Sequence, residues 1–200
     1  MKLYKICNKI SLLLHVLASA AGYFVMEAIC RHSFIEAWNY MTQRPLVFAY
    51  NAAFIFTSSL IVYLFHRRVF WRILVTLFWL ILAIINGVLL LNRVTPFTGP
   101  DVKNLTDGLS IAKKYLTHTQ MTIGAVLLGI AVLILLIILI RSPKYRGKLK
   151  YKVNIPLVLV GVLAFGGITQ LALEKRVLSN YFGNIAIAYE DYGYPYCLAT

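Results

Sequence analysis

The stretch ILVTLFWLILAIINGVLLL at residues 73–91 contains no charged residue and decides the fold class. A helix needs roughly 20 residues, at about 1.5 Å each, to cross the roughly 30 Å hydrocarbon core of a bilayer. Other stretches of the chain are comparably long and apolar, namely residues 10–30, 46–65, 121–140 and 153–173. The sequence therefore predicts an all-α, multi-pass membrane protein with about five transmembrane helices.

The composition agrees with a protein whose solvent is the bilayer. Of 200 residues, 60% are hydrophobic, whereas soluble domains usually have about half. The 20 Lys and Arg against 7 Asp and Glu give a formal net charge of +13, which alone would be compatible with nucleic-acid binding. These basic residues lie in short clusters between the apolar stretches, where they set topology and attract headgroups. We therefore expect the lipid bilayer and anionic lipid headgroups as partners, and no nucleic acid.

The distribution of charge predicts the orientation. Lys and Arg near a membrane span resist translocation and therefore stay in the cytoplasm. With the N-terminus inside, most of them fall on cytoplasmic segments, and all seven acidic residues lie on or near the outer side. We predict a cytoplasmic N-terminus and an external C-terminus, in a bacterial plasma membrane.

A cleaved signal peptide is the alternative interpretation of residues 10–30. The basic start MKLYKICNK, the short apolar core ISLLLHVL and the small residues at 18–20 fit such a peptide. The apolar character continues through residues 22–26, beyond the usual end of a signal core, and this favours a retained helix. Its removal would leave the other spans oriented as before.

The outer loop at residues 92–120 opens with NRVTPFTGPD and is predicted to contain a helix. Thr98 and Asp101 have the spacing of a capping box, and Pro100 suits a first helical turn. One face of the following segment is apolar: Val102, Leu105, Leu109, Ala112 and Leu116. This pattern predicts an amphipathic helix in the outer membrane interface. It would serve either as a platform for headgroups or a partner domain, or merely as a connection between two spans.

Ionisable and polar residues within the apolar stretches are candidates for function because their burial in lipid is costly. For His15, a bond to a neighbouring helix competes with a proton or headgroup contact. For Glu27, near the outer end of its span, we expect a solvated or arginine-paired carboxylate. Asn51, Asn86 and Gln170 are expected to form hydrogen bonds between helices.

The three cysteines, Cys7, Cys30 and Cys197, have no metal-ligand spacing, so we predict no metal site. Cys30 and Cys197 would lie on one side of the membrane. A disulfide between them is conceivable, and two separate thiols are the preferred interpretation.

The tail at residues 174–200 reads EKRVLSNYFGNIAIAYEDYGYPYCLAT and is unusually rich in tyrosine. Interfacial tyrosines are common in membrane proteins. The turn in YGYPYC has no evident segment to fold back onto, which suggests that the partner of this tail is missing. We therefore expect a partial protein.

The predicted spans, the TPFTGPD stretch at 95–101 and the FGNIAIAYEDYGYPYC stretch at 182–197 resemble the N-terminal membrane module of the lipoteichoic acid synthase family, which includes related phosphoglycerol transferases. Residues that match the loop motif are Arg93, Thr95, Pro96 and Asp101. Residues that match the junction after the last span are Asn184, Tyr189, Tyr192 and Gly193.

The resemblance implies transfer of glycerol phosphate from phosphatidylglycerol to a growing polymer or glycan. In the family, a threonine nucleophile beside a divalent metal, usually manganese, lies in an extracellular domain of the sulfatase and alkaline-phosphatase type. That domain would begin after residue 200, so the chain itself is predicted to hold no catalytic residue, no metal ligand and no cofactor.

We therefore expect a membrane anchor and docking module that engages a sulfatase-like domain in cis or in trans. Candidate contacts to headgroups or to that domain are Arg93, Thr95, Pro96, Asp101, Lys113 and Lys114. The alternatives are a small transporter or channel subunit and a free-standing membrane regulator that binds a partner enzyme.

Overall fold

A computed structural model describes residues 11–91, 93–99, 101, 118–141 and 151–199. Within these ranges the regular structure is helical and contains no β-strand. The elements, in chain order, are α2 (Ser11–Cys30), α3 (Phe34–Gln43), α4 (Pro45–Ser59), the 3-10 helix η1 (Leu60–Leu64), α5 (Arg68–Leu90), α8 (His118–Arg141), α9 (Tyr151–Glu174), α10 (Ile185–Tyr192) and α11 (Tyr194–Ala199).

Four of the described helical segments are long and apolar enough to cross a membrane, and they agree with the predicted spans. They are Leu12–Cys30, Pro45–Leu64, Arg68–Leu90 and Tyr151–Glu174. The remaining predicted span, residues 121–140, coincides with α8, a helix of 24 residues. The prediction of an all-α chain whose helices suit a multi-pass membrane protein is therefore confirmed at this level.

The largest boundary difference from prediction among the described helices is at the start of α5, which begins at Arg68 rather than at residue 73. The prediction excluded Arg68 and Arg72 on account of their charge. Arginine can lie at the end of a membrane helix because its aliphatic stem contacts apolar surface while the guanidinium extends toward the headgroups.

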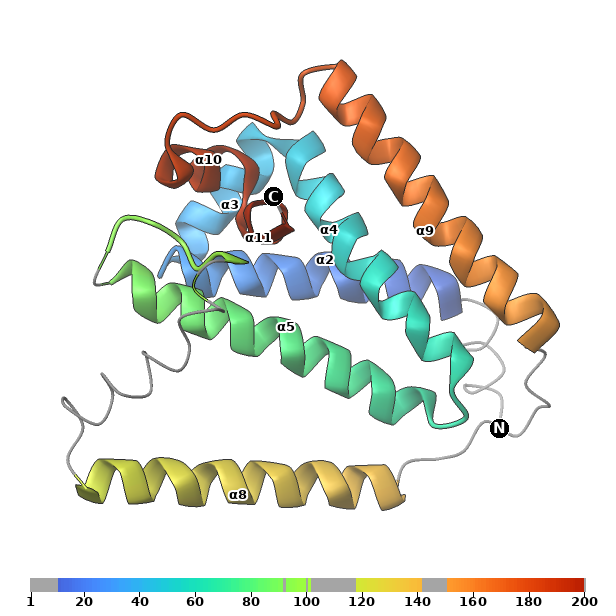
Figure 1. Cartoon of the computed structure of the whole chain (residues 1–200), viewed down its shortest axis with the longest axis vertical. Coiled ribbons are helices and arrows are strands. Elements are labelled where there is room, and N and C mark those ends of the chain that lie inside the picture. Colours follow the sequence, from blue (N-terminus) through green and yellow to red (C-terminus); the bar gives the residue numbers. More distant parts are fainter. Residues whose placement is uncertain (1–10, 92, 100, 102–117, 142–150, 200) are drawn as a thin grey trace.

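The helix α2 lies at the centre of the bundle and packs against α3, α4 and α5 (Figure 1). Buried side chains at these contacts include Tyr23, Met26 and Trp79. The helix α9 lies at the edge, against α4 and η1. Gly161 permits this close approach, since a Cβ there would come within 2.5 Å of Leu60 Cδ1.

The short helix α3 was not predicted. Its N-cap is Ser33, whose hydroxyl accepts a hydrogen bond from the Glu36 N–H at 3.3 Å. The helix leaves Phe34, Ile35 and Trp38 exposed, and an apolar face of this kind suits the membrane interface. The amphipathic helix that the sequence predicts in the outer loop falls mostly on residues 102–117, outside the described residues.

The tail folds back onto the bundle as α10 and α11, beside α3 and the adjoining end of α4 (Figure 1). Tyr194 is fully buried, and Cys197 is nearly so. The expectation that this tail has nothing to fold back onto is therefore wrong. The tail folds back because its aromatic side chains become buried against residues of α2 and α4, which are distant from the tail in the sequence.

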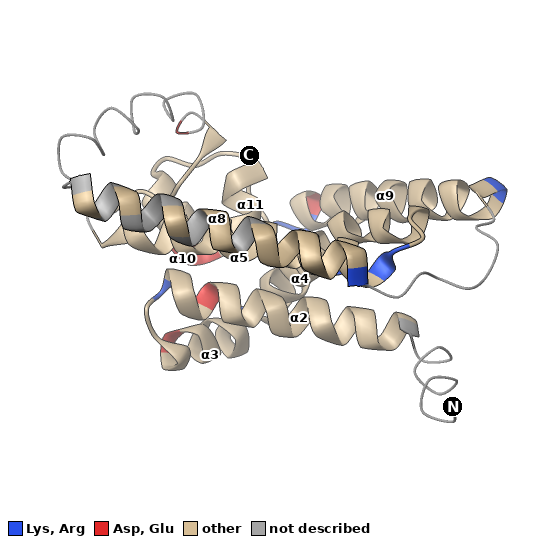
Figure 2. Cartoon of the chain, turned by 90° about the horizontal axis from the view of Figure 1, so that it is seen from below, with Lys and Arg blue, Asp and Glu red and all other residues tan. Residues whose placement is uncertain are grey.

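Acidic and basic residues are unevenly distributed in the described part of the chain. Figure 2 shows acidic positions toward the end that carries α3 and α10, where Arg31 and Arg44 also lie, whereas the coloured positions at the opposite ends of α8 and α9 are basic. Arg68 is the first residue of α5 and Arg141 is the last residue of α8, and both lie at that opposite end.

Candidate functional site

The tail is held by a set of polar and aromatic residues at one end of the bundle, which we name the tail-docking site. It consists of Tyr23, Glu27, Arg31, Tyr40, Arg44 and Asn51. These residues come from α2 and the turn that follows it, from α3, from the α3–α4 junction and from α4. The site therefore exists only once the bundle has assembled.

Glu27 is the centre of the tail-docking site. Its side chain is fully buried and accepts hydrogen bonds from Tyr23 Oη at 2.8 Å, Arg31 Nε at 2.9 Å and the Tyr194 N–H at 3.1 Å. A buried carboxylate is stable only when such partners replace its lost hydration. Of the two expected states, the arginine-paired carboxylate is the one observed, and the docked tail covers the group.

Asn51 supplies the second attachment. Its amide nitrogen donates to the backbone oxygens of Val47, at 3.0 Å, and Tyr192, at 2.7 Å, while its Oδ1 accepts from the Tyr196 N–H at 3.0 Å. The expected hydrogen bonds between helices are therefore confirmed for Asn51, and its partners are the tail helices α10 and α11. Two backbone groups of a short buried segment are satisfied in this way.

Gly193 joins α10 to α11 with a φ of +75° and a ψ of 169°. This backbone conformation is essentially restricted to glycine. A Cβ at this position would also meet Tyr23 Oη, lie 2.6 Å from Tyr40 Oη and lie 3.0 Å from Glu27 Oε1. The junction glycine is therefore required both for the turn and for its close fit against α2.

Ionic contacts lie at the rim of the site. Arg44 forms an ion pair with Asp191 at 2.6 Å, and Arg31 donates to the Glu190 backbone oxygen at 3.2 Å. The Arg31 guanidinium also lies over the Tyr40 ring, 4.2 Å from its centroid. Because the Arg44 pair is partly exposed, its contribution to stability is small, and orientation of the tail is its main effect.

Burial changes the acidity of the groups in and around the docked tail. It raises the pKa of Tyr40 and of Tyr189 well above the ordinary value, and the nearby Glu27 charge adds to both shifts. Burial, followed by Glu27, raises the pKa of the Cys197 thiol to about 12. Cys197 and Cys30 are separate thiols, which confirms the preferred interpretation.

The described loop residues 93–99 and 101 form a second compact unit. Arg93 binds Asp101 in a bidentate manner, at 3.0 and 2.6 Å, and donates to the backbone oxygens of Thr95 and Pro96. Asp101 also accepts from the Thr98 N–H at 2.8 Å, which is one of the two hydrogen bonds of the predicted capping box, while the Thr98 hydroxyl donates to the same carboxylate at 3.2 Å. Asn86 of α5 fastens this unit by accepting from the Phe97 N–H at 2.7 Å.

The same contacts set the ionisation of the pair. Hydrogen bonding to Arg93 lowers the pKa of Asp101 below its ordinary value of 3.8, against a smaller opposite effect of burial. Hydrogen bonding to Asp101 correspondingly raises the pKa of Arg93. The Arg93 donors are directed at protein acceptors in this arrangement. A role for Arg93 in binding headgroups stays a prediction, and Lys113 and Lys114 lie outside the described residues.

The sequence motif at 182–197 identified the docked tail, whereas the residues of the tail-docking site that receive it were not predicted as a set. Asn184 caps α10 by accepting from the Ala186 N–H at 2.8 Å, and Tyr189 is buried in the docked tail. The receiving residues Glu27 and Asn51 were considered only singly. The spacing of Tyr23, Glu27 and Arg31, four apart along one helix face, is the signal that could have identified them.

The described residues of the tail-docking site provide a contact surface for the tail. No group of three or more His, Cys, Asp or Glu within the described part of the chain could hold a metal ion. No family model, no curated protein and no solved structure matches the sequence.

Proposed function

We propose that the chain is the membrane anchor and docking module of a phosphoglycerol transferase of the lipoteichoic acid synthase type. The observation that supports this proposal is the fixed position of the tail, which Glu27 and Asn51 hold by its backbone. A catalytic domain joined to such a tail would leave the membrane at one defined point and orientation.

The proposal includes five spans, with the N-terminus in the cytoplasm of a bacterial cell and the tail outside. The helix α8 would be the additional span, since 24 residues reach about 36 Å. The basic residues at the ends of α5 and α8 away from the tail support this orientation.

Anchoring would contribute to the reaction by position alone. Phosphatidylglycerol is confined to the membrane, so a catalytic domain held at the outer leaflet meets it at a raised effective concentration. The threonine nucleophile and the divalent metal, manganese in most relatives, would belong to the sulfatase-like domain. The residues described here bind, orient and support that domain, in cis or as a partner in trans.

Reconstitution into liposomes that contain phosphatidylglycerol tests this proposal. We expect the chain alone to release no diacylglycerol, and we expect a sulfatase-like domain of this family to bind the liposomes only when the chain is present. Asn51→Leu should weaken this recruitment, and Gln170→Leu, which changes an exposed amide that bonds only within α9, should not. Turnover by the chain alone, or equal recruitment to empty liposomes, would contradict the proposal.

Two other functions predict different results. A free-standing regulator would bind a separate partner enzyme and change its rate. A transporter or channel subunit would carry solute into proteoliposomes in the absence of any added domain.

A further inference from the structure

The end of the bundle away from the tail carries three arginines at the start of α5. Arg67 is the N-cap of this helix, Arg68 is its first residue, and Arg72 lies one turn further on. The N-terminus of a helix already has a partial positive charge, so cations there are unfavourable unless an anion is close. The first turn of α5 has no acidic residue.

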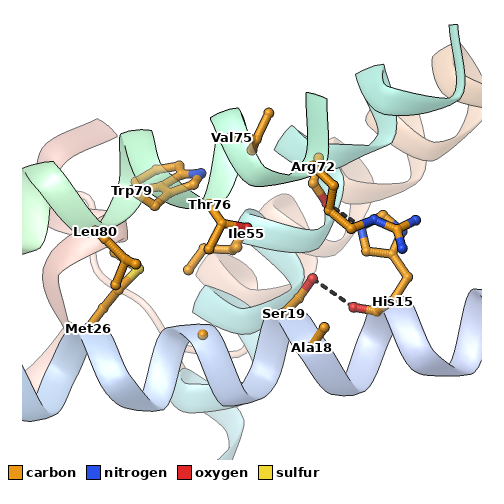
Figure 3. A pocket seen from close by; sticks show the side chains of 12 residues that line it. His15, Ala18, Ser19, Met26, Ile55, Arg72, Val75, Thr76, Trp79 and Leu80 are labelled. Atoms are coloured by element: carbon orange, nitrogen blue, oxygen red, sulfur yellow. Dashed lines mark hydrogen bonds between the residues drawn. The ribbon is translucent and has the colours of Figure 1, made fainter. Parts of the chain in front are cut away.

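Arg72 lines a small cavity between α2, α4 and α5. The cavity has a volume of about 70 Å³, and Figure 3 shows His15, Ile55, Arg72 and Trp79 around it. His15, Ser19, Ser59 and Trp79, also at its wall, form hydrogen bonds within the protein. His15 bonds to Ser59 and to Tyr63 Oη, the latter at 3.1 Å, and Trp79 Nε1 donates to Ser58 Oγ at 2.9 Å.

The guanidinium groups differ from these neighbours. Among the described residues, Arg72 Nε and Arg67 Nη1 are buried and have no hydrogen-bond acceptor. Buried donors, above all charged ones, are normally paired. Two orphaned guanidinium atoms at one helix end therefore indicate an anionic ligand.

An apolar groove begins at Arg72 and continues along α5. It has a volume of about 340 Å³, within the usual range for small-molecule sites, and is lined by Val69, Arg72, Ile73, Thr76, Leu77 and Leu80. These residues recur at helical spacing and so form one face of α5. Arg72, Thr76 and Leu80 line both the groove and the cavity, so the two spaces adjoin.

We propose that Arg72 binds the phosphate of an anionic phospholipid whose acyl chain lies in this groove. A guanidinium matches the geometry of a phosphate, and Arg67 and Arg68 add positive charge at the same end. Arg72 lies about 6 Å along the helix axis from Arg68, at the depth where a span passes from headgroups to hydrocarbon. The phosphate of the lipid supplies the acceptor that the Arg72 guanidinium lacks, and the acyl chain of the same lipid covers the apolar side chains of the groove. The site is at the opposite end of the bundle from the docked tail and does not depend on the function proposed above.

Native mass spectrometry of the detergent-purified chain tests the proposal with three probes. These are dihexanoyl phosphatidylglycerol, dihexanoyl phosphatidylcholine, and glycerol 3-phosphate as the free anion. We expect phosphatidylglycerol to bind about tenfold more tightly than phosphatidylcholine, because only the former has net negative charge. Glycerol 3-phosphate should bind about 100-fold more weakly, because it cannot fill the groove.

Variants separate the phosphate contact from the groove. Arg72→Gln should abolish the preference for phosphatidylglycerol, and Arg72→Lys should retain part of it. Ile73→Trp should weaken binding of both lipids by filling the groove. Lys152→Gln is the matched control, since it removes an exposed cation from the first turn of α9.

Three outcomes would overturn the proposal. Equal binding of the two lipids by the unmodified chain would leave only apolar contact. An undiminished preference in Arg72→Gln, in protein that unfolds at the unmodified temperature, would place the anion elsewhere. Binding of glycerol 3-phosphate as tight as that of the lipid would indicate a site for a free anion.

Discussion

Glu27 and Asn51 hold the tail through its backbone, and this distinguishes them from the aromatic side chains around them. Their tail partners are the N–H groups of Tyr194 and Tyr196 and the carbonyl of Tyr192. Backbone recognition fixes the path of a segment whatever its side chains are. The aromatic side chains then contribute burial, and the two polar residues specify the position.

Replacing Asn51 by leucine should release the tail. The change keeps the approximate volume of the side chain and removes the hydrogen bonds of Asn51 to the Tyr196 N–H and the Tyr192 carbonyl, at a cost of about 1–3 kcal/mol. Cys197 reports the release because its pKa of about 12, against an ordinary value of 9.0, suppresses the reactive thiolate. We expect maleimide labelling of Cys197 at pH 8 to accelerate about tenfold or more.

The control for this experiment is Gln170→Leu, which should label at the unmodified rate. Peptide mass spectrometry assigns the label to Cys197 and distinguishes it from Cys7 and Cys30. An unchanged rate in Asn51→Leu would show that the tail is held without this side chain.

Gly193→Ala should displace the tail by a different route. The new Cβ would require a strained backbone, which costs about 1–3 kcal/mol, and would also collide with Tyr23 Oη. Hydrogen exchange of the residues of α11 should become faster. The matched control is Gly183→Ala, where a Cβ has nothing within 4 Å, and unchanged exchange in Gly193→Ala would contradict the described turn.

The contribution of the Arg93–Asp101 pair to the stability of the fold should depend on pH. Because the pKa of Asp101 is lowered in the folded chain, the pair stabilises the fold above the ordinary value of 3.8 and loses this effect as pH falls through the lowered pKa. Asp101→Asn should therefore melt below the unmodified chain at neutral pH, and the difference should shrink in acid. The control compares Arg93→Gln with the double variant Arg93→Gln/Asp101→Asn at neutral pH. If Asp101→Asn lowers the melting temperature as much there as in the unmodified chain, the ion pair is not the source of the effect.

At the scale of elements, the long helices could be predicted because apolar length is a local property of the sequence. The helix α3 was not predicted because it has only ten residues and these alternate between apolar and polar side chains without a long apolar stretch. Docking of α10 and α11 could not be predicted in the same way. The Glu27–Tyr194 contact joins residues 167 positions apart, and neither residue alone indicates its partner.

The helix α2 should be retained in the mature protein, although its start resembles a signal peptide. It packs against α3, α4 and α5, and it supplies His15, Tyr23 and Glu27 to buried contacts. Cleavage after Ala20 would remove His15 and Ser19, which line the cavity, and would leave a charged N-terminus within the bundle. Intact mass measurement of the membrane-extracted protein should include residues 1–20. A mass that lacks these residues would establish the signal-peptide interpretation.

For the whole molecule, the distribution of charged residues supports one orientation in the membrane, and the proposed functions depend on that orientation. At the tail-docking end, acidic residues are paired with Arg31 and Arg44, whereas the start of α5 and the end of α8, at the opposite end of the bundle, carry arginines and no acidic residue (Figure 2). A membrane that retains positive charge on its inner side would place the docked tail outside. The proposed anchor and the proposed lipid site would then serve different leaflets, the outer one for the catalytic domain and the inner one for the bound phospholipid.

The number of crossings decides whether this arrangement is possible. Four crossings return the chain to the side from which it started, whereas a fifth crossing by α8 places the two ends on opposite sides. We expect an N-terminal tag to be protected from protease in intact bacterial cells whose envelope admits the protease, and a C-terminal tag to be removed. A cysteine introduced at position 67, before α5, should label only after the membrane is opened. Removal of both tags from intact cells would show that the two ends lie on the same side of the membrane. The helix α8 would then not cross the membrane, and the proposed topology would be wrong.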